Sequence, residues 1–181
     1  MLQFPKPYAD AVARLRVPSG FLIVVVFAWL SHPTSESLAW GVPVSIAGLA
    51  LRAWAAGCLA KNQQLATGGP YAYTRNPLYI GTLLVAAGLT IAARNPILGA
   101  LFAAVFVLVY LPVIQLEEQY LRVIFPDYAI YADHVPALIP RLTPYPKKSL
   151  NPFRGSLYLR NQEYQAGIGF FAGMLFLLWK M

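Results

Sequence analysis

The residues best suited to chemistry in this sequence lie in two short polar clusters separated by long apolar runs. The first cluster is the stretch 68–81, GGPYAYTRNPLYIG, in which tyrosines, one arginine and two prolines stand together. The second is the adjacent carboxylate pair Glu117-Glu118. Aromatic faces and carboxylates attract cations, whereas an arginine and the free N–H groups of a helix start attract carboxylates or phosphates. A ligand that carries both signs of charge therefore suits this set of residues best.

Prolines and glycines give the stretch 68–81 a defined backbone. Each proline fixes φ, removes a hydrogen-bond donor and pushes the residue before it out of helical geometry. We therefore predict a shaped loop at the end of a membrane helix. Glu117 and Glu118 point about 100° apart on a helix, so we expect one to line the site and the other to meet Arg75, Arg52 or lipid headgroups. The alternative interpretation is that both glutamates only end a helix at the membrane interface.

The composition places the chain in a membrane. The 181 residues are 58% hydrophobic and 12% charged, whereas a soluble domain has about 25% charged residues. Apolar runs of about 20 residues match the thickness of the hydrocarbon layer. The formal charge is +7, but the basic residues lie between apolar segments instead of gathering on one face. Nucleic-acid binding is therefore not expected.

These patterns predict one all-α integral membrane domain over residues 1–181, with about five transmembrane helices. The predicted spans are 17–31, 38–59, 77–93, 97–116 and 166–180. The third and fourth spans form a hairpin because only a tight turn, 94–96, connects them. Pro112 is expected to bend the fourth helix. The first apolar run could also be a signal peptide, but residues 31–35 lack a small-x-small cleavage site, which favours a retained helix.

The distribution of Lys and Arg predicts the orientation of the helices. Basic residues concentrate in the N-terminus, in segment 60–76 and in segment 117–165, which includes Lys147 and Lys148. By the positive-inside rule these parts face the cytoplasm and the C-terminus lies outside. Both polar clusters then share the cytoplasmic side and form a pocket there. Arg52, inside the second span, either reaches the headgroups or faces a partner.

Several other kinds of site are not expected. The sequence has no GxGxxG after a strand, no GxxxxGK[ST] and no Ser/His/Asp grouping. Cys58 is the single cysteine, so an intrachain disulfide cannot form. His32 and His134 are far apart and have no neighbouring ligand pattern. We therefore expect no metal site.

The stretch 69–81 resembles the GPYxYxRHPxYxG signature of the isoprenylcysteine carboxyl methyltransferase-like membrane enzymes, which neighbour the phospholipid methyltransferases. Residues 51–55, LRAWA, are similar to the lRxWa segment of that family, and Gln63-Gln64-Leu65 is similar to its HxLV lead-in. Glu117-Glu118, then FPDYAIY at 125–131 and the dipeptide at 139–140, resemble the family tail EExxL…FGxxYxxY…IP. The ordered resemblance covers about residues 48–141.

This resemblance implies that S-adenosylmethionine is the methyl donor and S-adenosylhomocysteine the product. It implies a lipid or amphiphilic small-molecule acceptor at the membrane. The residues it implies for catalysis are Arg75, Asn76 and Glu118, of which Arg75 could orient an anionic acceptor. Those it implies for cofactor binding are Gln64, Leu65, Ala66, Tyr71, Tyr73, Pro77, Tyr79, Glu117, Tyr128 and Tyr131.

The sequence departs from the family pattern where the family has two histidines. Asn76 and Gln63 stand at these places, and both keep hydrogen bonding but lose a titratable base. Two alternatives to a membrane methyltransferase stay open. One is an NADPH-dependent reductase of the sterol reductase type, which would need a larger basic site and usually more helices. The other is a non-catalytic membrane binding protein.

Overall fold

The computed structural model describes residues 4–146 and 152–181, and the regular structure of these residues is entirely helical, as the sequence predicts. Lys147 and Lys148 lie outside the described residues. The helices are α1 (Lys6–Leu30), α2 (Ser35–Cys58), the 3₁₀ turn η1 (Gly69–Ala72), α3 (Pro77–Ala93), α4 (Pro96–Val105), the π-helical turn η2 (Phe106–Tyr110), α5 (Leu111–Ile124), α6 (Tyr128–His134), α7 (Gly155–Arg160) and α8 (Tyr164–Lys180).

Fewer helices than predicted have the length and apolar character of a membrane span. Among the described residues, α2 and the continuous helix Pro96–Ile124 qualify, and α1 is a third if its two bent parts form one span. Helix α3 has 17 residues and is about 26 Å long, against roughly 30 Å of hydrocarbon. The sequence-based count of five took every apolar run as a span, whereas a short helix crosses only a thinned bilayer.

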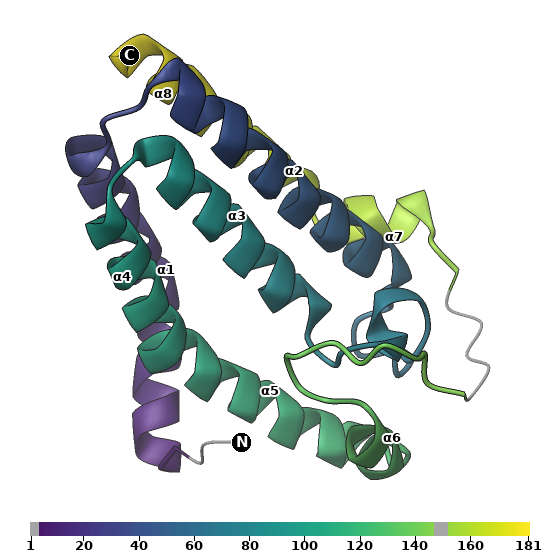
Figure 1. Cartoon of the computed structure of the whole chain (residues 1–181). Coiled ribbons are helices and arrows are strands. Elements are labelled where there is room, and N and C mark those ends of the chain that lie inside the picture. The colour runs from purple at the N-terminus through teal and green to yellow at the C-terminus, as the bar shows by residue number, and fades with distance from the viewer. Residues whose placement is uncertain (1–3, 147–151) are drawn as a thin grey trace.

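Helices α2 and α3 lie side by side and antiparallel (Figure 1), with small residues at their interface. A Cβ added to Gly41 would lie 2.4 Å from the Gly88 carbonyl oxygen, and one added to Gly48 would lie 2.7 Å from that of Gly81. Inside a membrane, helices associate largely through such close packing of small residues. The result places the end of α2 beside the start of α3, where the connecting segment 59–76 begins and ends.

The long helix that runs from α4 to α5 carries the two glutamates to this loop. The π-helical turn η2 ends two residues before Pro112, and the helix changes direction there (Figure 1). Because proline lacks an N–H and clashes with the preceding turn, a bend at this position follows from its chemistry. The bend predicted at Pro112 thus agrees with the structure. The Tyr8 hydroxyl donates to the Leu108 carbonyl, 2.8 Å away, inside the wide turn.

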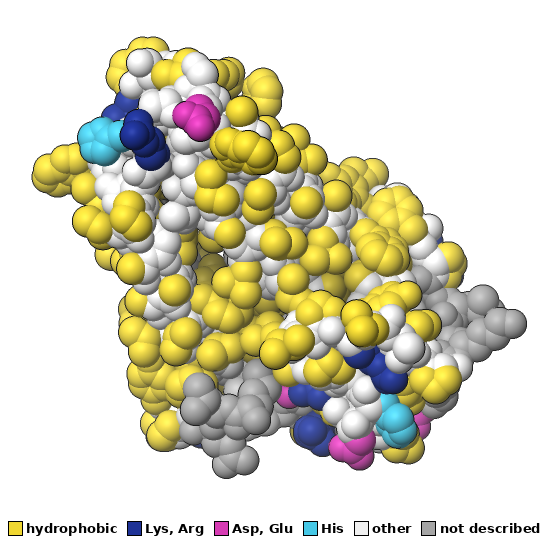
Figure 2. All heavy atoms as spheres, viewed as in Figure 1, with side chains coloured by type: hydrophobic (Ala, Val, Ile, Leu, Met, Phe, Trp, Pro, Cys, Tyr) yellow, Lys and Arg dark blue, Asp and Glu magenta, His cyan; other side chains and the backbone are white. Residues whose placement is uncertain are grey.

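Polar groups gather at the two ends of the molecule. The N-terminal end of α1, the loop before α3 and helix α6 lie toward one end, and the C-terminus lies toward the other (Figure 1). In Figure 2 the charged side chains of the visible face cluster at these two ends, with a broad hydrophobic band between them. At the C-terminal end, Lys180 donates to the carbonyls of Ala28 and Trp29, and so holds α8 against the end of α1.

Candidate functional site

The loop between α2 and α3 is built around the turn η1. Gly69 has φ +57°, and a Cβ there would lie 2.8 Å from Cys58 Sγ, so both its conformation and its surroundings require glycine. Pro77 is the first residue of α3, where its fixed φ is compatible with a helix and no N–H is needed. The glycines and prolines of the sequence motif therefore determine where the loop turns and where α3 begins.

The proline-rich segment after α6 runs along this loop and covers it. The Arg75 N–H donates to the Pro136 carbonyl at 2.9 Å, and the Arg141 N–H donates to the Tyr73 carbonyl at 2.9 Å. The Thr74 hydroxyl is buried and donates a hydrogen bond of 3.1 Å to a backbone carbonyl of the segment after α6. These hydrogen bonds give backbone N–H and C=O groups of each irregular segment a partner in the other. The two segments therefore stay ordered without forming a sheet.

Arg75 joins the loop to both α5 and α6. Its Nε and Nη2 lie 2.9 Å and 2.8 Å from the same oxygen, Oε1, of Glu118. Its Nη1 donates to the carbonyls of Ala132 and Val135, at 2.7 Å and 2.8 Å, at the C-terminal end of α6. A helix C-terminus carries partial negative charge, so the guanidinium is held by a carboxylate and by a helix end. The two side chains are only 11% and 12% exposed.

The two adjacent glutamates take different partners, as expected from their angular separation. Glu118 is buried against Arg75, which confirms that one member of the pair meets this arginine. Glu117 is exposed and accepts a hydrogen bond from the Tyr79 hydroxyl at 3.0 Å. The Asn76 amide donates to the Ala137 carbonyl at 3.1 Å and lies 3.5 Å from Glu118 Oε1. The asparagine therefore acts as a hydrogen-bond donor at the base of α3.

Three buried tyrosines form the inner wall of this region. The Tyr131 hydroxyl donates to the Tyr71 carbonyl at 2.7 Å. The hydroxyl of Tyr71 is buried and has no hydrogen-bond partner among the described residues. Burial raises the pKa of Tyr71, Tyr128 and Tyr131 above the ordinary value; at Tyr128 and Tyr131 the Glu118 carboxylate adds to the rise and the Arg75 guanidinium opposes it. All three hydroxyls therefore remain protonated at neutral pH.

The other residues predicted to bind a cofactor lie around this wall at different depths. Leu65 packs against Tyr128 and Tyr131, and Ala66 is buried beside Tyr71. Gln64 is exposed, Tyr73 is half-buried and Pro77 is buried.

One aromatic residue of the site was missed by the sequence interpretation. The ring of Tyr110 contacts the ring of Tyr79 edge-on, with centroids 5.9 Å apart. It also stacks on Phe106, within the π-helical turn. The signal that could have found it is its position seven residues before Glu117, which places both side chains on one helix face.

A second arginine–glutamate pair lies beside the loop. Arg52 Nε and Nη2 lie 2.5 Å and 3.1 Å from the two oxygens of Glu163. Of the two alternatives for Arg52, headgroups or a partner, the structure shows the partner. Glu163 lies 111 residues away in sequence, between α7 and α8, and no local pattern links it to Arg52.

These features define an all-helical protein of membrane type with a polar loop held against the end of a long bent helix. Residues 39–128, about half of the chain, match the family model described as phospholipid methyltransferase. Residues 39–128 therefore belong to the phospholipid methyltransferase family. The matched segment includes the loop, α3, Arg75 and both glutamates.

Two curated proteins are similar to this chain. It is 39% identical over 101 residues to the cobalt-zinc-cadmium resistance protein CzcN of Cupriavidus metallidurans, covering 56% of this chain and 47% of that protein. It is 32% identical over 123 residues to the nickel-cobalt-cadmium resistance protein NccN of Alcaligenes xylosoxydans xylosoxydans, covering 67% of this chain and 56% of that protein. The chain thus matches about half the length of these relatives. No solved structure matches it.

Proposed function

We propose that this protein is an integral membrane methyltransferase that uses S-adenosylmethionine and modifies a lipid or another amphiphilic small molecule at the cytoplasmic face. The contact between Arg75 and Glu118 carries this proposal. It joins the loop of the methyltransferase signature to the carboxylate pair 43 residues later, and both lie in the segment that belongs to the family.

The residues at this place suit S-adenosylmethionine, which carries a sulfonium, an ammonium and a carboxylate. The exposed carboxylate of Glu117 and the rings of Tyr79 and Tyr110 offer a negative charge and aromatic faces to a cation. The buried hydroxyl of Tyr71, without a partner among the described residues, is a donor for a polar atom of a ligand. We assign these four residues to the cofactor, together with the neighbouring positions of the family motif.

When bound, S-adenosylmethionine supplies a methyl group that is electrophilic because it is attached to a sulfonium. Methyl transfer is an in-line displacement, so the protein contributes mainly by positioning and by excluding water. In our proposal Arg75 and Glu118 neutralise each other and hold the loop against α5 and α6. Asn76 holds the base of α3 and cannot accept a proton. Glu117 is our candidate group for a proton released by the acceptor.

We also propose that the chain crosses the membrane several times, with the candidate site on the cytoplasmic side. The concentration of Lys and Arg in the segments at this end supports that orientation. Helices α3 and α8, of 17 residues each, would cross in a locally thinned bilayer.

Calorimetric titration of the detergent-purified protein tests the proposed cofactor. We expect S-adenosylmethionine and S-adenosylhomocysteine to bind with micromolar affinity and NADPH not to bind. Glu117→Gln and Tyr71→Phe should each weaken binding about tenfold, the effect of one lost charge-assisted or buried hydrogen bond. Glu36→Gln and Tyr120→Phe are matched controls, because Glu36 begins α2 at the other end of the molecule and Tyr120 is exposed. Binding of NADPH alone would support the reductase instead.

A second candidate function is a part in resistance to divalent metal ions, which the names of the two relatives favour. Among the described residues, no three His, Cys, Asp or Glu side chains come together to hold a metal ion. We therefore propose that the protein contributes to metal resistance by modifying membrane molecules. Growth of a deletion strain on cobalt, complemented with wild-type protein or with Glu117→Gln, tests it. Equal rescue by both would favour a non-catalytic role.

A further inference from the structure

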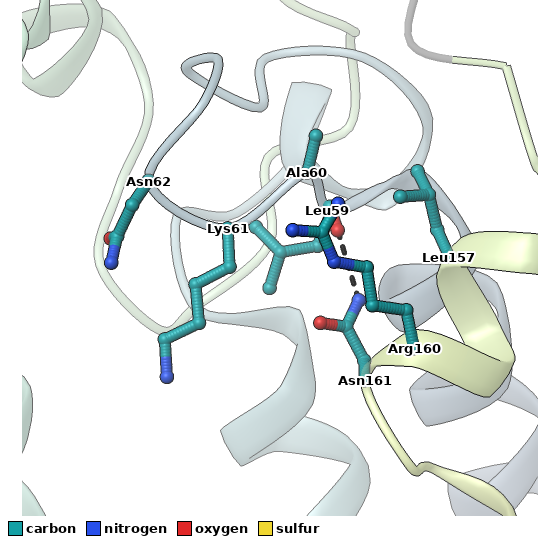
Figure 3. A pocket seen from close by; sticks show the side chains of 7 residues that line it. All are labelled: Leu59, Ala60, Lys61, Asn62, Leu157, Arg160 and Asn161. Carbon is teal, nitrogen blue, oxygen red and sulfur yellow. Dashed lines mark hydrogen bonds between the residues drawn. The ribbon is translucent and has the colours of Figure 1, made fainter.

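A basic cavity lies between the turn that follows α2 and helix α7. Its volume is about 240 Å³, and it is lined by Leu59, Ala60, Lys61, Asn62, Leu157, Arg160 and Asn161 (Figure 3). Lys61 comes from the turn on one side and Arg160 from α7 on the other. The lining includes these two cations and no acidic side chain, so the cavity attracts an anion.

The walls of this cavity are fixed by contacts with the end of α2. The Asn161 amide donates to the carbonyls of Ala56 and Leu59, both at 2.9 Å, and the second of these bonds is drawn in Figure 3. The Arg154 N–H donates to the Gly57 carbonyl at 2.8 Å. These carbonyls belong to the last turn of α2 and to its C-cap residue Leu59, where a helix leaves backbone acceptors for partners from outside. Helix α7 is therefore held in place by the helix end that it satisfies.

The guanidinium of Arg160 is also held in one orientation. When the Gln63 amide is turned so that its oxygen faces the guanidinium, this oxygen accepts from Nη2 at 3.0 Å and from Nη1 at 3.1 Å. A guanidinium has five N–H donors, so donors remain for a further oxygen ligand. Arginine and lysine together are the usual protein partners of a phosphate.

An apolar hollow of about 300 Å³ lies further along the same helix. It is lined by Ile46, Leu49, Ala50, Ala53, Tyr158, Glu163 and Gly167. Ile46 precedes Leu59 by thirteen positions, which is roughly 20 Å along the α2 axis toward the interior of the membrane. Helix α7 borders both spaces, through Leu157 in the basic cavity and Tyr158 in the hollow. The basic cavity lies at the end of a candidate membrane span, and the hollow lies beside its apolar part.

We propose that these two spaces bind one anionic phospholipid, with its phosphate between Lys61 and Arg160 and an acyl chain along α2 in the apolar hollow. The residues of α7 and α8 that line these two spaces lie outside the segment 39–128 that matches the methyltransferase family. The site does not depend on methyl transfer and is separate from the Arg75–Glu118 pair. Basic residues at the end of a membrane span attract anionic lipid headgroups, and this attraction weakens as the salt concentration rises.

Lipid exchange into detergent-purified protein, measured by native mass spectrometry, tests this site. We expect phosphatidylglycerol to bind more tightly than phosphatidylcholine, and Lys61→Gln/Arg160→Gln to weaken phosphatidylglycerol binding about tenfold or more. The control Lys6→Gln/Arg14→Gln removes the same charge from exposed positions of α1 and should change binding less than about twofold. Equal losses in both double variants would overturn the proposal, because the attraction would then be general.

Two further measurements separate a lipid from a free anion. Inorganic phosphate and glycerol phosphate should not displace phosphatidylglycerol at millimolar concentration; if they do, the ligand is a soluble phosphate and the lipid proposal is wrong. Ala53→Phe fills the hollow and should weaken phosphatidylglycerol binding without lowering the melting temperature. An unchanged lipid affinity in that variant would contradict the placement of the acyl chain. Neither result depends on whether S-adenosylmethionine binds.

Discussion

Two arginine–glutamate pairs connect distant parts of this molecule, and they differ in what surrounds them. Arg75 contacts Glu118 and also donates to two backbone carbonyls of the α6 end, with both side chains nearly enclosed by protein. Arg52 contacts Glu163 from within helix α2 and also donates to the Thr82 hydroxyl; the Arg52 side chain is 24% exposed, whereas that of Glu163 is 9% exposed. The first pair lies inside the methyltransferase segment, whereas the second connects this segment to the C-terminal helices.

The difference indicates separate roles for the two pairs. When an enclosed guanidinium loses its carboxylate partner, water cannot reach it to take the place of that partner. The first pair is therefore needed for the loop to keep its shape. Arg52 is more exposed than Arg75, so water can replace part of what its guanidinium loses when Glu163 is removed. The first pair therefore maintains the proposed cofactor site, and the second positions the helices that enclose the proposed lipid site.

Removal of Arg75 should have the largest effect. Arg75→Ala leaves Glu118 buried without its partner and two carbonyls of α6 without their donor, so we expect a loss of about 3–5 kcal/mol in the free energy of unfolding. Binding of S-adenosylmethionine should be lost as well. Thermal unfolding in detergent and calorimetry measure the two effects. Arg141→Ala is the control, because this guanidinium also donates to a backbone carbonyl, but in a hydrogen bond that is exposed to solvent. Equal melting temperatures for the two variants would contradict the stabilising role assigned to the enclosed Arg75.

Separation of Arg52 and Glu163 should have an intermediate effect. A double-mutant cycle with Arg52→Ala and Glu163→Gln should give a coupling energy of about 1–2 kcal/mol, between the values for exposed and buried pairs. S-adenosylmethionine binding should stay within about threefold of wild type, because this pair lies outside the proposed cofactor site. Phosphatidylglycerol binding should weaken, since α7 and α8 lose an attachment to α2. A coupling energy as large as that from the same cycle with Arg75→Ala and Glu118→Gln would show that exposure does not distinguish the pairs.

A smaller effect is expected from the hydroxyl of Tyr131. Tyr131→Phe removes the donor to the Tyr71 carbonyl, which should cost about 1 kcal/mol or slightly more in the free energy of unfolding. Tyr120→Phe is the matched control, because Tyr120 is exposed on α5. If both variants unfold at the wild-type temperature, the hydrogen bond between α6 and the loop contributes no stability.

The smallest effect at neutral pH concerns the titration of the buried tyrosines. Their pKa is raised in the folded protein, so the stabilisation is fully present below the unfolded value of about 10 and declines as the pH rises above it. Melting temperatures should therefore be unaffected by this titration up to about pH 9 and should fall above about pH 10. Tyrosinate absorbance should show that part of the 11 tyrosines ionise only on unfolding. A single ionisation step in the folded protein would contradict their burial.

Local chemistry explains what could be predicted before the structure was known. Proline at position 77 and the turn at 94–96 limit a helix to the residues where α3 is found, since proline favours a first turn and cannot continue a preceding one. The bend near Pro112 follows from an equally local feature, whereas the contact of Glu118 with Arg75 joins residues 43 positions apart and was one of several alternatives that the sequence left open. The number of membrane spans did not follow, because apolar character alone does not determine whether a short helix reaches across a bilayer.

By itself the sequence determined an all-helical membrane-type chain, a shaped loop at 68–81 and the methyltransferase resemblance, because each is encoded in neighbouring residues. Only the tertiary structure decided that Glu163 pairs with Arg52, that Asn161 satisfies the end of α2 and that the Tyr71 hydroxyl is buried without a partner among the described residues. These contacts join residues that are distant in sequence. They exist because the packing of α2 with α3, α7 and α8 brings them together, and no local pattern of residues specifies that packing.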